Sequence, residues 1–259
     1  MTAAATLEHP LRFSVHSRLR AFHLARMMPD GTGKVLLDNG CGLGFLTATL
    51  GGGYDLALGI DMDLGSLRSN RARGLGVMAM SGAARLPLAD ASVDVILCSE
   101  VLEHLPDGVD AEAMAEMGRV LKPGGRLYIT VPALEGVRSR TALRNLGHDD
   151  PNGGEYHYRI GYGQDALRAL VAAVPGLTAL RHRYSMALLS ELFMDLLKLV
   201  YFRKGKLHEH SDLMSANASP LFRVYRRIFP LLFAAFVAED FVLCPWLRGH
   251  IHILEIRKD

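Results

Sequence analysis

Short apolar runs alternate with amphipathic stretches along most of the chain. The apolar runs predict buried strands, and the amphipathic stretches between them predict helices. The expected strands are 34–37, 57–60, 77–80, 93–98, 126–131, 177–184 and 249–257. The expected helices of this part are 11–28, 45–50, 64–73, 111–121 and 164–173. Such alternation is typical of right-handed βαβ units, so the pattern predicts an α/β fold with a mostly parallel sheet of seven strands.

The pattern changes after residue 132. Residues 133–163 are rich in Gly, His, Asp and Asn and predict a long loop, and loops of this length are uncommon unless they are functional. Two apolar helical segments around a polar linker follow at 185–245, ahead of the last strand. We therefore expect four parts: an N-terminal helical arm (1–32), a core (33–184), an apolar helical insertion (185–247) and the last strand of the core (248–259).

Composition narrows the class of protein. The length of 259 residues suits one α/β domain with an elaboration, and 49% hydrophobic residues suffice for a core. With 29 basic and 27 acidic residues the net charge of +2 gives no field for nucleic acid, which we do not expect as a partner. Three widely spaced cysteines without a CxxC pair favour a reducing, cytoplasmic compartment. Neither a signal peptide nor a membrane-spanning stretch is recognisable.

A glycine-rich turn, Asp38-Asn-Gly-Cys-Gly-Leu-Gly44, lies between the first strand and the helix after it. Glycine permits positive φ and lets a ligand approach the backbone, and the helix offers free N–H groups at its start. Asp61 ends the next strand, where a carboxylate can accept both hydroxyls of a ribose. Phe45 replaces the third glycine of the dinucleotide fingerprint, which argues against a bound pyrophosphate. A turn that serves only tight packing is the alternative.

Five segments in order resemble the motifs of class I S-adenosylmethionine-dependent methyltransferases, in the ubiquinone/menaquinone-biosynthesis-like branch (methyltransferase type 11). They are Val35–Gly44, Gly59–Asp63, Leu86–Cys98, Glu100–Leu105 and Leu121–Leu127. The resemblance covers roughly residues 33–132, with a weaker echo to 184. It implies a Rossmann-like fold, S-adenosyl-L-methionine as cofactor and methyl transfer as the activity.

The resemblance also implies a cofactor site at the ends of the strands. The residues it assigns to cofactor binding are Asp38, Gly40, Cys41, Gly42, Gly44, Asp61, Met62, Gly82, Ser99 and Glu100. The glycine loop would line the methionine moiety, Asp61 would hold the ribose hydroxyls, and Met62 would lie against the adenine. Relatives often have an acid for the adenine amine where this chain has Gly82, so a backbone contact would replace it. Ser99 and Glu100 would border the cofactor.

Two histidines are candidate catalytic bases, which are needed only if the acceptor carries a proton. His104 follows the fourth strand and is alternatively a packing or capping residue. His157 lies in the long loop, near the place where relatives often have a histidine before the helix expected at 164–173. That region covers the acceptor pocket in relatives, so His157 ranks above His104. Other His and Asp residues of the loop match no fixed metal motif, and no metal is expected.

The apolar insertion allows three interpretations. In the first, its helices pack on the sheet or on each other. In the second, they admit a hydrophobic acceptor, and their basic residues meet anionic headgroups at the inner face of a membrane. In the third, they form a homodimer face. Met186–Phe202 carries one polar stripe of Glu191, Asp195 and Lys198. Insertions before the last strand commonly cap the acceptor site in the enzymes that this chain resembles, which favours a substrate role.

The sequence thus predicts transfer of a methyl group to a small, hydrophobic acceptor, such as a lipid, quinone, isoprenoid or polyketide-like molecule. Oxygen is favoured as the acceptor atom, with carbon next. Cys98-Ser-Glu-Val stands where nitrogen methyltransferases of amides and nucleobases have Asn/Asp-Pro-Pro-Tyr, which argues against nitrogen. The alternatives are a non-catalytic S-adenosylmethionine-binding scaffold or regulatory partner and, less favoured, an NAD-type oxidoreductase.

Overall fold

A seven-stranded sheet forms the centre of the computed structural model, which describes residues 9–137, 158–202 and 220–259. The strands are β1 (Val35–Asn39), β2 (Leu56–Asp61), β3 (Val77–Met80), β4 (Val93–Ser99), β5 (Leu121–Pro132), β6 (Leu177–Ser185) and β7 (Ile251–Lys258). Their order is β3-β2-β1-β4-β5-β7-β6, and only β7 runs antiparallel to its neighbours. The predicted α/β fold with a mostly parallel, seven-stranded sheet is confirmed.

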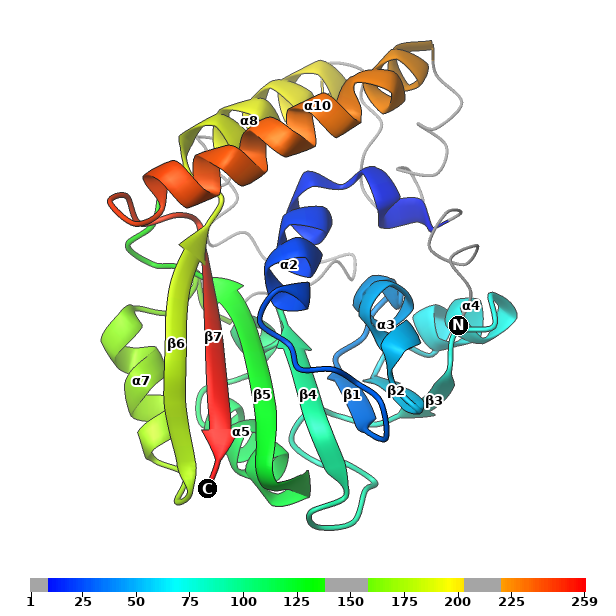
Figure 1. The fold of residues 1–259 in the computed structure, drawn as a ribbon, viewed down its shortest axis with the longest axis vertical. Helices are drawn as coiled ribbons and strands as arrows, with labels where there is room; N and C mark the ends of the chain where they lie inside the picture. The colour runs from blue at the N-terminus through cyan, green and yellow to red at the C-terminus, as the bar shows by residue number, and fades with distance from the viewer. Residues whose placement is uncertain (1–8, 138–157, 203–219) are drawn as a thin grey trace.

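Helices cover both faces of this sheet (Figure 1). They are α2 (Val15–Ala25), α3 (Phe45–Leu50), α4 (Leu64–Ala72), α5 (Val109–Val120), α7 (Gln164–Ala172), α8 (Leu188–Phe202) and α10 (Pro220–Leu243), with short 3₁₀ turns η1 (Pro10–Phe13), η2 (Gly51–Gly53) and η3 (Leu102–His104). Successive strand residues point to opposite faces. Leu127 of β5 therefore joins the core under α5 and α7, whereas Tyr128 joins the core under α2 and α3.

The N-terminal helix is shorter than the sequence predicts. One continuous helix over 11–28 is wrong, because Ser14 adopts an extended conformation and its hydroxyl accepts a hydrogen bond from the Ser17 N–H at 3.3 Å. A side-chain acceptor in that place starts a new helix. The preceding turn directs His9 to the glycine loop, where its Nε2 lies 2.8 Å from the carbonyl oxygen of Leu43.

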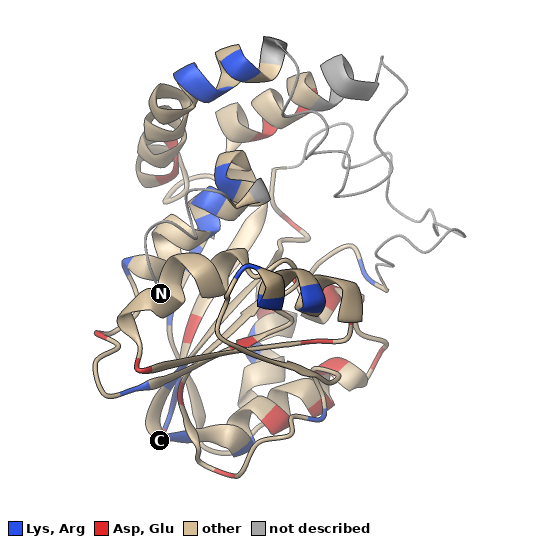
Figure 2. Ribbon diagram, turned by 90° about the vertical axis from the view of Figure 1, so that its right-hand side faces the viewer, with Lys and Arg blue, Asp and Glu red and all other residues tan. Residues whose placement is uncertain are grey.

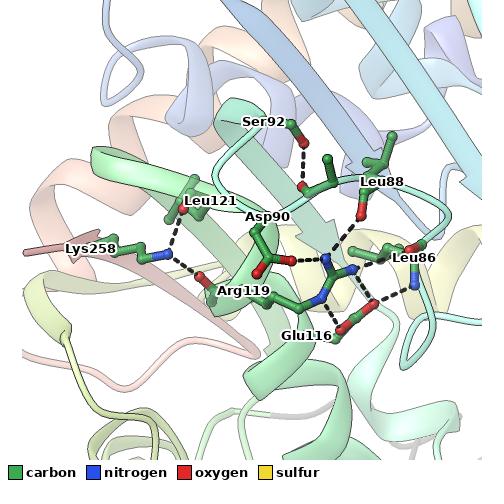
Figure 3. Close-up of polar contacts among 10 residues, drawn as sticks. Leu86, Leu88, Asp90, Ser92, Glu116, Arg119, Leu121 and Lys258 are labelled. Atoms are coloured by element: carbon green, nitrogen blue, oxygen red, sulfur yellow. Dashed lines mark hydrogen bonds and ion pairs between the residues drawn. The ribbon is translucent and has the colours of Figure 1, made fainter.

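Arg119 of α5 anchors the segment that leads into β4 (Figure 3). Its guanidinium donates to the carbonyl oxygens of Leu86 and Leu88, and it forms ion pairs with Asp90 and Glu116. Glu116 also accepts a hydrogen bond from the Leu86 N–H at 2.8 Å. This network holds the segment that begins at Leu86-Pro87, and so fixes the place where β4 starts.

The helices α8 and α10, together called the cap, lie side by side beyond the carboxyl ends of β5 and β6 (Figure 1). Buried acids of α10 fasten the cap to the core. Asp240 accepts hydrogen bonds from the Met186 N–H at 2.8 Å and from the Ser185 hydroxyl, and His23 Nε2 of α2 lies 2.8 Å from its Oδ2. Glu239 accepts from the first N–H groups of α8. The helices occupy the expected insertion, while the four-part division of the chain stays a prediction.

Glu191, the first residue of the polar stripe of α8, does not face solvent. Glu191 is 3% exposed, whereas the leucines at 188, 189, 192 and 196 are each about half exposed. Among the helices in the described part of the chain, none is long and apolar enough to cross a membrane.

Candidate cofactor and acceptor site

The glycine loop turns sharply at the carboxyl end of β1. Gly40, Gly42 and Gly44 all have positive φ, at 79°, 47° and 72°, a region that residues with a Cβ rarely adopt. The N–H groups of Gly40 and Cys41 donate to the carbonyl oxygen of Ile60, so the loop lies against the end of β2. A Cβ at Gly42 would have no neighbour within 4 Å, which leaves the backbone there open to a ligand.

Three side chains outside the glycine motif hold the loop. The Asn70 amide of α4 donates to the carbonyl oxygen of Gly42 at 2.7 Å, and Arg73 donates to that of Leu43 at 2.5 Å. His9 contacts the same Leu43 carbonyl, and burial lowers the pKa of His9 to about 4, so that the ring is neutral near pH 7. Sequence reasoning missed all three, because their separation from the loop along the chain carries no local signal.

Asp61 is oriented by the backbone at the end of β2. Its Oδ2 accepts from the Gly42 N–H at 2.7 Å and its Oδ1 from the Asp63 N–H at 2.8 Å. Each oxygen retains a further lone pair. Met62, next in the chain, is 73% exposed, and a Cβ at Gly82 would lie 3.7 Å from its sulfur. The residues assigned to ribose and adenine therefore lie together on one edge of the sheet.

Asp38 and Cys41 lie beneath the loop rather than at its surface. The Thr47 hydroxyl of α3 donates to Asp38 Oδ2 at 2.6 Å, and the side chain is buried. Burial raises the pKa of Asp38 to about 6, and the nearby charge of Asp61 acts in the same direction. Burial also raises the pKa of the Cys41 thiol, which excludes a reactive thiolate there near pH 7.

Ser99 and Glu100 meet an arginine from α2 at the end of β4. Arg20 Nη1 lies 3.4 Å from the Ser99 hydroxyl and 3.5 Å from Glu100 Oε1. The Thr130 hydroxyl of β5 contacts both residues, at 2.7 Å and 3.2 Å respectively. Glu100 has a φ of 56°, a strained value for a residue with a Cβ that is often found at functional sites. The role of Arg20 was not foreseen, although its helix was predicted.

The two predicted catalytic histidines are differently placed. His104 ends η3, just after β4, and its backbone N–H donates to the Val101 carbonyl oxygen at 3.0 Å. His157 lies outside the described residues, so its role stays a prediction. The described residues after it are anchored by Arg159, which pairs with Asp107 and Asp110.

A further group of titratable side chains, Glu191, His16 and His250, lies where the cap meets α2. Glu191 of α8 is buried, and its carboxylate oxygens lie 3.8 Å from His16 Nε2 of α2 and 3.6 Å from His250 Nδ1. His16 is one helical turn from Arg20, and the His250 carbonyl oxygen accepts from the Ala133 N–H just after β5. The group therefore borders the carboxyl edge of the sheet on the side of the cap. Sequence reasoning gave these residues no role.

The edge of the sheet fits an adenosyl cofactor. An open glycine backbone follows β1, and a carboxylate with free lone pairs and an exposed methionine stand together at the end of β2, beside the point where the strand order reverses. No group of three or more His, Cys, Asp or Glu side chains within the described ranges could hold a metal ion.

Comparisons with known proteins agree with this geometry. Residues 37–129 match a family model described as a methyltransferase domain. A probable S-adenosylmethionine-dependent methyltransferase of Mycolicibacterium smegmatis is 38% identical over 101 residues, which are 39% of this chain and 38% of that protein. A demethylmenaquinone methyltransferase of Corynebacterium kroppenstedtii is 36% identical over 120 residues, 44% of this chain and 51% of that protein. The chain thus matches about half or less of these relatives.

Solved structures extend the likeness to the whole fold. An S-adenosylmethionine-dependent methyltransferase from Mesorhizobium loti aligns with a TM-score of 0.59 at 16% identity, over 95% of this chain and all of that one. At this identity the likeness concerns the fold alone. The family match identifies residues 37–129 as a methyltransferase domain, and the similar proteins imply S-adenosylmethionine as its cofactor.

Proposed function

We propose that this chain, whose core belongs to the class I S-adenosylmethionine-dependent methyltransferases, methylates a small hydrophobic acceptor at oxygen or carbon. The observation that carries the acceptor class is the cap. Its inner face bears aromatic residues that pack towards α2 beyond the carboxyl edge of the sheet, among them Phe193, Phe229 and Phe236. The similarity to a demethylmenaquinone methyltransferase supports the same class.

The residues at the carboxyl edge would bind and orient the two reactants. The glycine loop and Asp61 would hold the cofactor, which supplies an electrophilic methyl group on a sulfonium. Holding two reactants in line removes much of the entropic barrier of a displacement. Arg20 stands between this region and the cap, and its contacts with Ser99 and Glu100 would fix the wall between cofactor and acceptor.

An acceptor hydroxyl must lose its proton as the new O–CH₃ bond forms, and imidazole is the usual base near neutral pH. His16 and His250 are suitable because Glu191 lies near both rings and would stabilise an imidazolium. They join His157 and His104 as candidate bases.

Free thiols at the three cysteines support the proposed cytoplasmic location.

The first experiment is calorimetric titration with S-adenosylhomocysteine, with NADH as the control ligand. Binding of S-adenosylhomocysteine alone is expected, and binding of NADH alone would refute the proposal. The acceptor class is then tested with methyl-labelled S-adenosylmethionine and three probes: a prenylated naphthoquinol, a prenylated catechol and a water-soluble amine such as histamine. Label transfer to a prenylated probe supports the proposal. Transfer to the amine alone would refute a hydrophobic acceptor.

A further inference from the structure

The exposed side of α10 is apolar along most of its length. Between Arg227 and Arg248 every exposed residue is apolar, and the only two acids in this stretch, Glu239 and Asp240, are buried. The large exposed side chains on this side include Ile228, Leu231, Val242, Trp246 and Leu247, of which Leu231 is 76% and Trp246 87% exposed. A surface helix normally places its charged residues outward, so this arrangement is the reverse of the usual one.

The neighbouring helix α8 extends the apolar surface. Its exposed leucines at 188, 189, 192 and 196 recur at helical spacing, and Glu191 between them points inward. The two helices lie side by side and away from the sheet (Figure 1). We call this exposed side of α8 and α10, with the residues up to Leu247, the outer cap face. Soluble proteins rarely expose an apolar surface of this extent without a partner.

Basic residues stand at one end of the outer cap face. In the ribbon of Figure 2, Lys and Arg positions are blue near the start of α10, and a long stretch without charged residues follows. They are Arg223, Arg226 and Arg227, all exposed. No ion pair joins Arg223 or Arg227 to another described residue. Apolar side chains flanked by arginines, in described helices that are not both long and apolar enough to cross a bilayer, are typical of segments that lie in a membrane interface.

We propose that the outer cap face docks the protein onto an anionic lipid bilayer. The apolar side chains would enter the headgroup region, Trp246 would take the interfacial position that tryptophan favours, and the arginines would meet lipid phosphates. A second copy of this chain fits less well, because the described residues of this face include no exposed acid to pair with the arginines of its twin. Docking in this way would place the acceptor side of the sheet directly beneath the membrane.

The test measures cosedimentation of the full chain with vesicles of phosphatidylcholine alone and with vesicles that also contain phosphatidylglycerol. Binding to the anionic vesicles is expected, and it should weaken as salt is raised. Leu231→Glu should reduce the affinity at least about tenfold, since a leucine that would be buried in the bilayer is replaced by a charge. Arg223→Gln and Arg227→Gln should each reduce it about fivefold. Leu180→Glu, on exposed β6, is the matched control and should leave it unchanged.

Titration with S-adenosylhomocysteine shows whether each variant retains its fold, and it separates this proposal from the proposed function. Lack of vesicle binding by a chain that binds S-adenosylhomocysteine would overturn the docking proposal and leave the proposed function standing. Equal binding to both kinds of vesicle, unaffected by the arginine substitutions, would overturn the anionic partner. Light scattering that shows a dimer, converted to a monomer by Leu231→Glu, would assign the face to a second copy instead.

Discussion

The carboxylate of Asp61 offers the sharpest test of the cofactor site. Backbone N–H groups already hold each of its oxygens, at 2.7 and 2.8 Å, and orient the remaining lone pairs. Two ribose hydroxyls would donate to those lone pairs. Their loss in Asp61→Ala should weaken binding of S-adenosylhomocysteine by about 2–4 kcal/mol, or about 30- to 1,000-fold. Asp61→Asn keeps one acceptor oxygen and should lie between the wild type and Asp61→Ala.

Asp63 supplies a matched control two residues away. Its carboxylate accepts from the Gly65 and Ser66 N–H groups, both at 2.9 Å, and so caps α4 without belonging to the predicted ribose site. Asp63→Ala should cost about 1 kcal/mol of unfolding free energy, the usual value of an N-cap, and change the affinity little. Calorimetry for affinity and urea unfolding for stability distinguish the two. Equal losses of affinity in Asp61→Ala and Asp63→Ala would refute the ribose assignment.

Three further predictions concern the buried groups around the site. Asp240→Ala should lower the unfolding free energy by about 3–5 kcal/mol in urea titrations, because His23 loses its buried partner; a loss under about 1 kcal/mol would show that the cap is held otherwise. Gly40→Ala should impair S-adenosylhomocysteine binding in calorimetry, since the new Cβ would lie 2.3 Å from Val101 Cγ2 in a backbone region that disfavours alanine; unchanged binding would contradict the observed turn. Asp38 has a folded pKa of about 6, raised from 3.8, so the folded state binds the extra proton and stability should fall as pH rises between about 4 and 6. Asp38→Asn should lack that fall. If the unfolding free energies of both proteins, measured by urea titration, change with pH in the same way across this range, the raised pKa of Asp38 is contradicted.

Local patterns predicted much of the fold and the glycine turn on which the cofactor assignment depends. The strand, glycine turn, helix and acidic strand end lie within a short stretch of sequence, and their geometry depends on neighbouring residues. The predicted 45–50 helix and 77–80 strand agree with α3 and β3. The tertiary structure brings the residues assigned to ribose and adenine to one edge of the sheet. The acceptor side could not be predicted in this way, because its residues come from segments far apart in the chain.

Arg20 illustrates what local sequence patterns cannot predict. Its position in an amphipathic helix was evident, but its contact with Ser99 joins residues 79 positions apart and depends on how α2 crosses the sheet. Glu191 illustrates it more strongly. Periodicity identifies which residues share a face of α8, but it does not say which face the rest of the protein covers. The sequence by itself determined the Rossmann-like core and its glycine loop. Only the tertiary structure decided that Glu191, Glu239 and Asp240 of the cap are buried while the leucines at 188, 189, 192 and 196 are exposed, because burial is set by packing between distant segments.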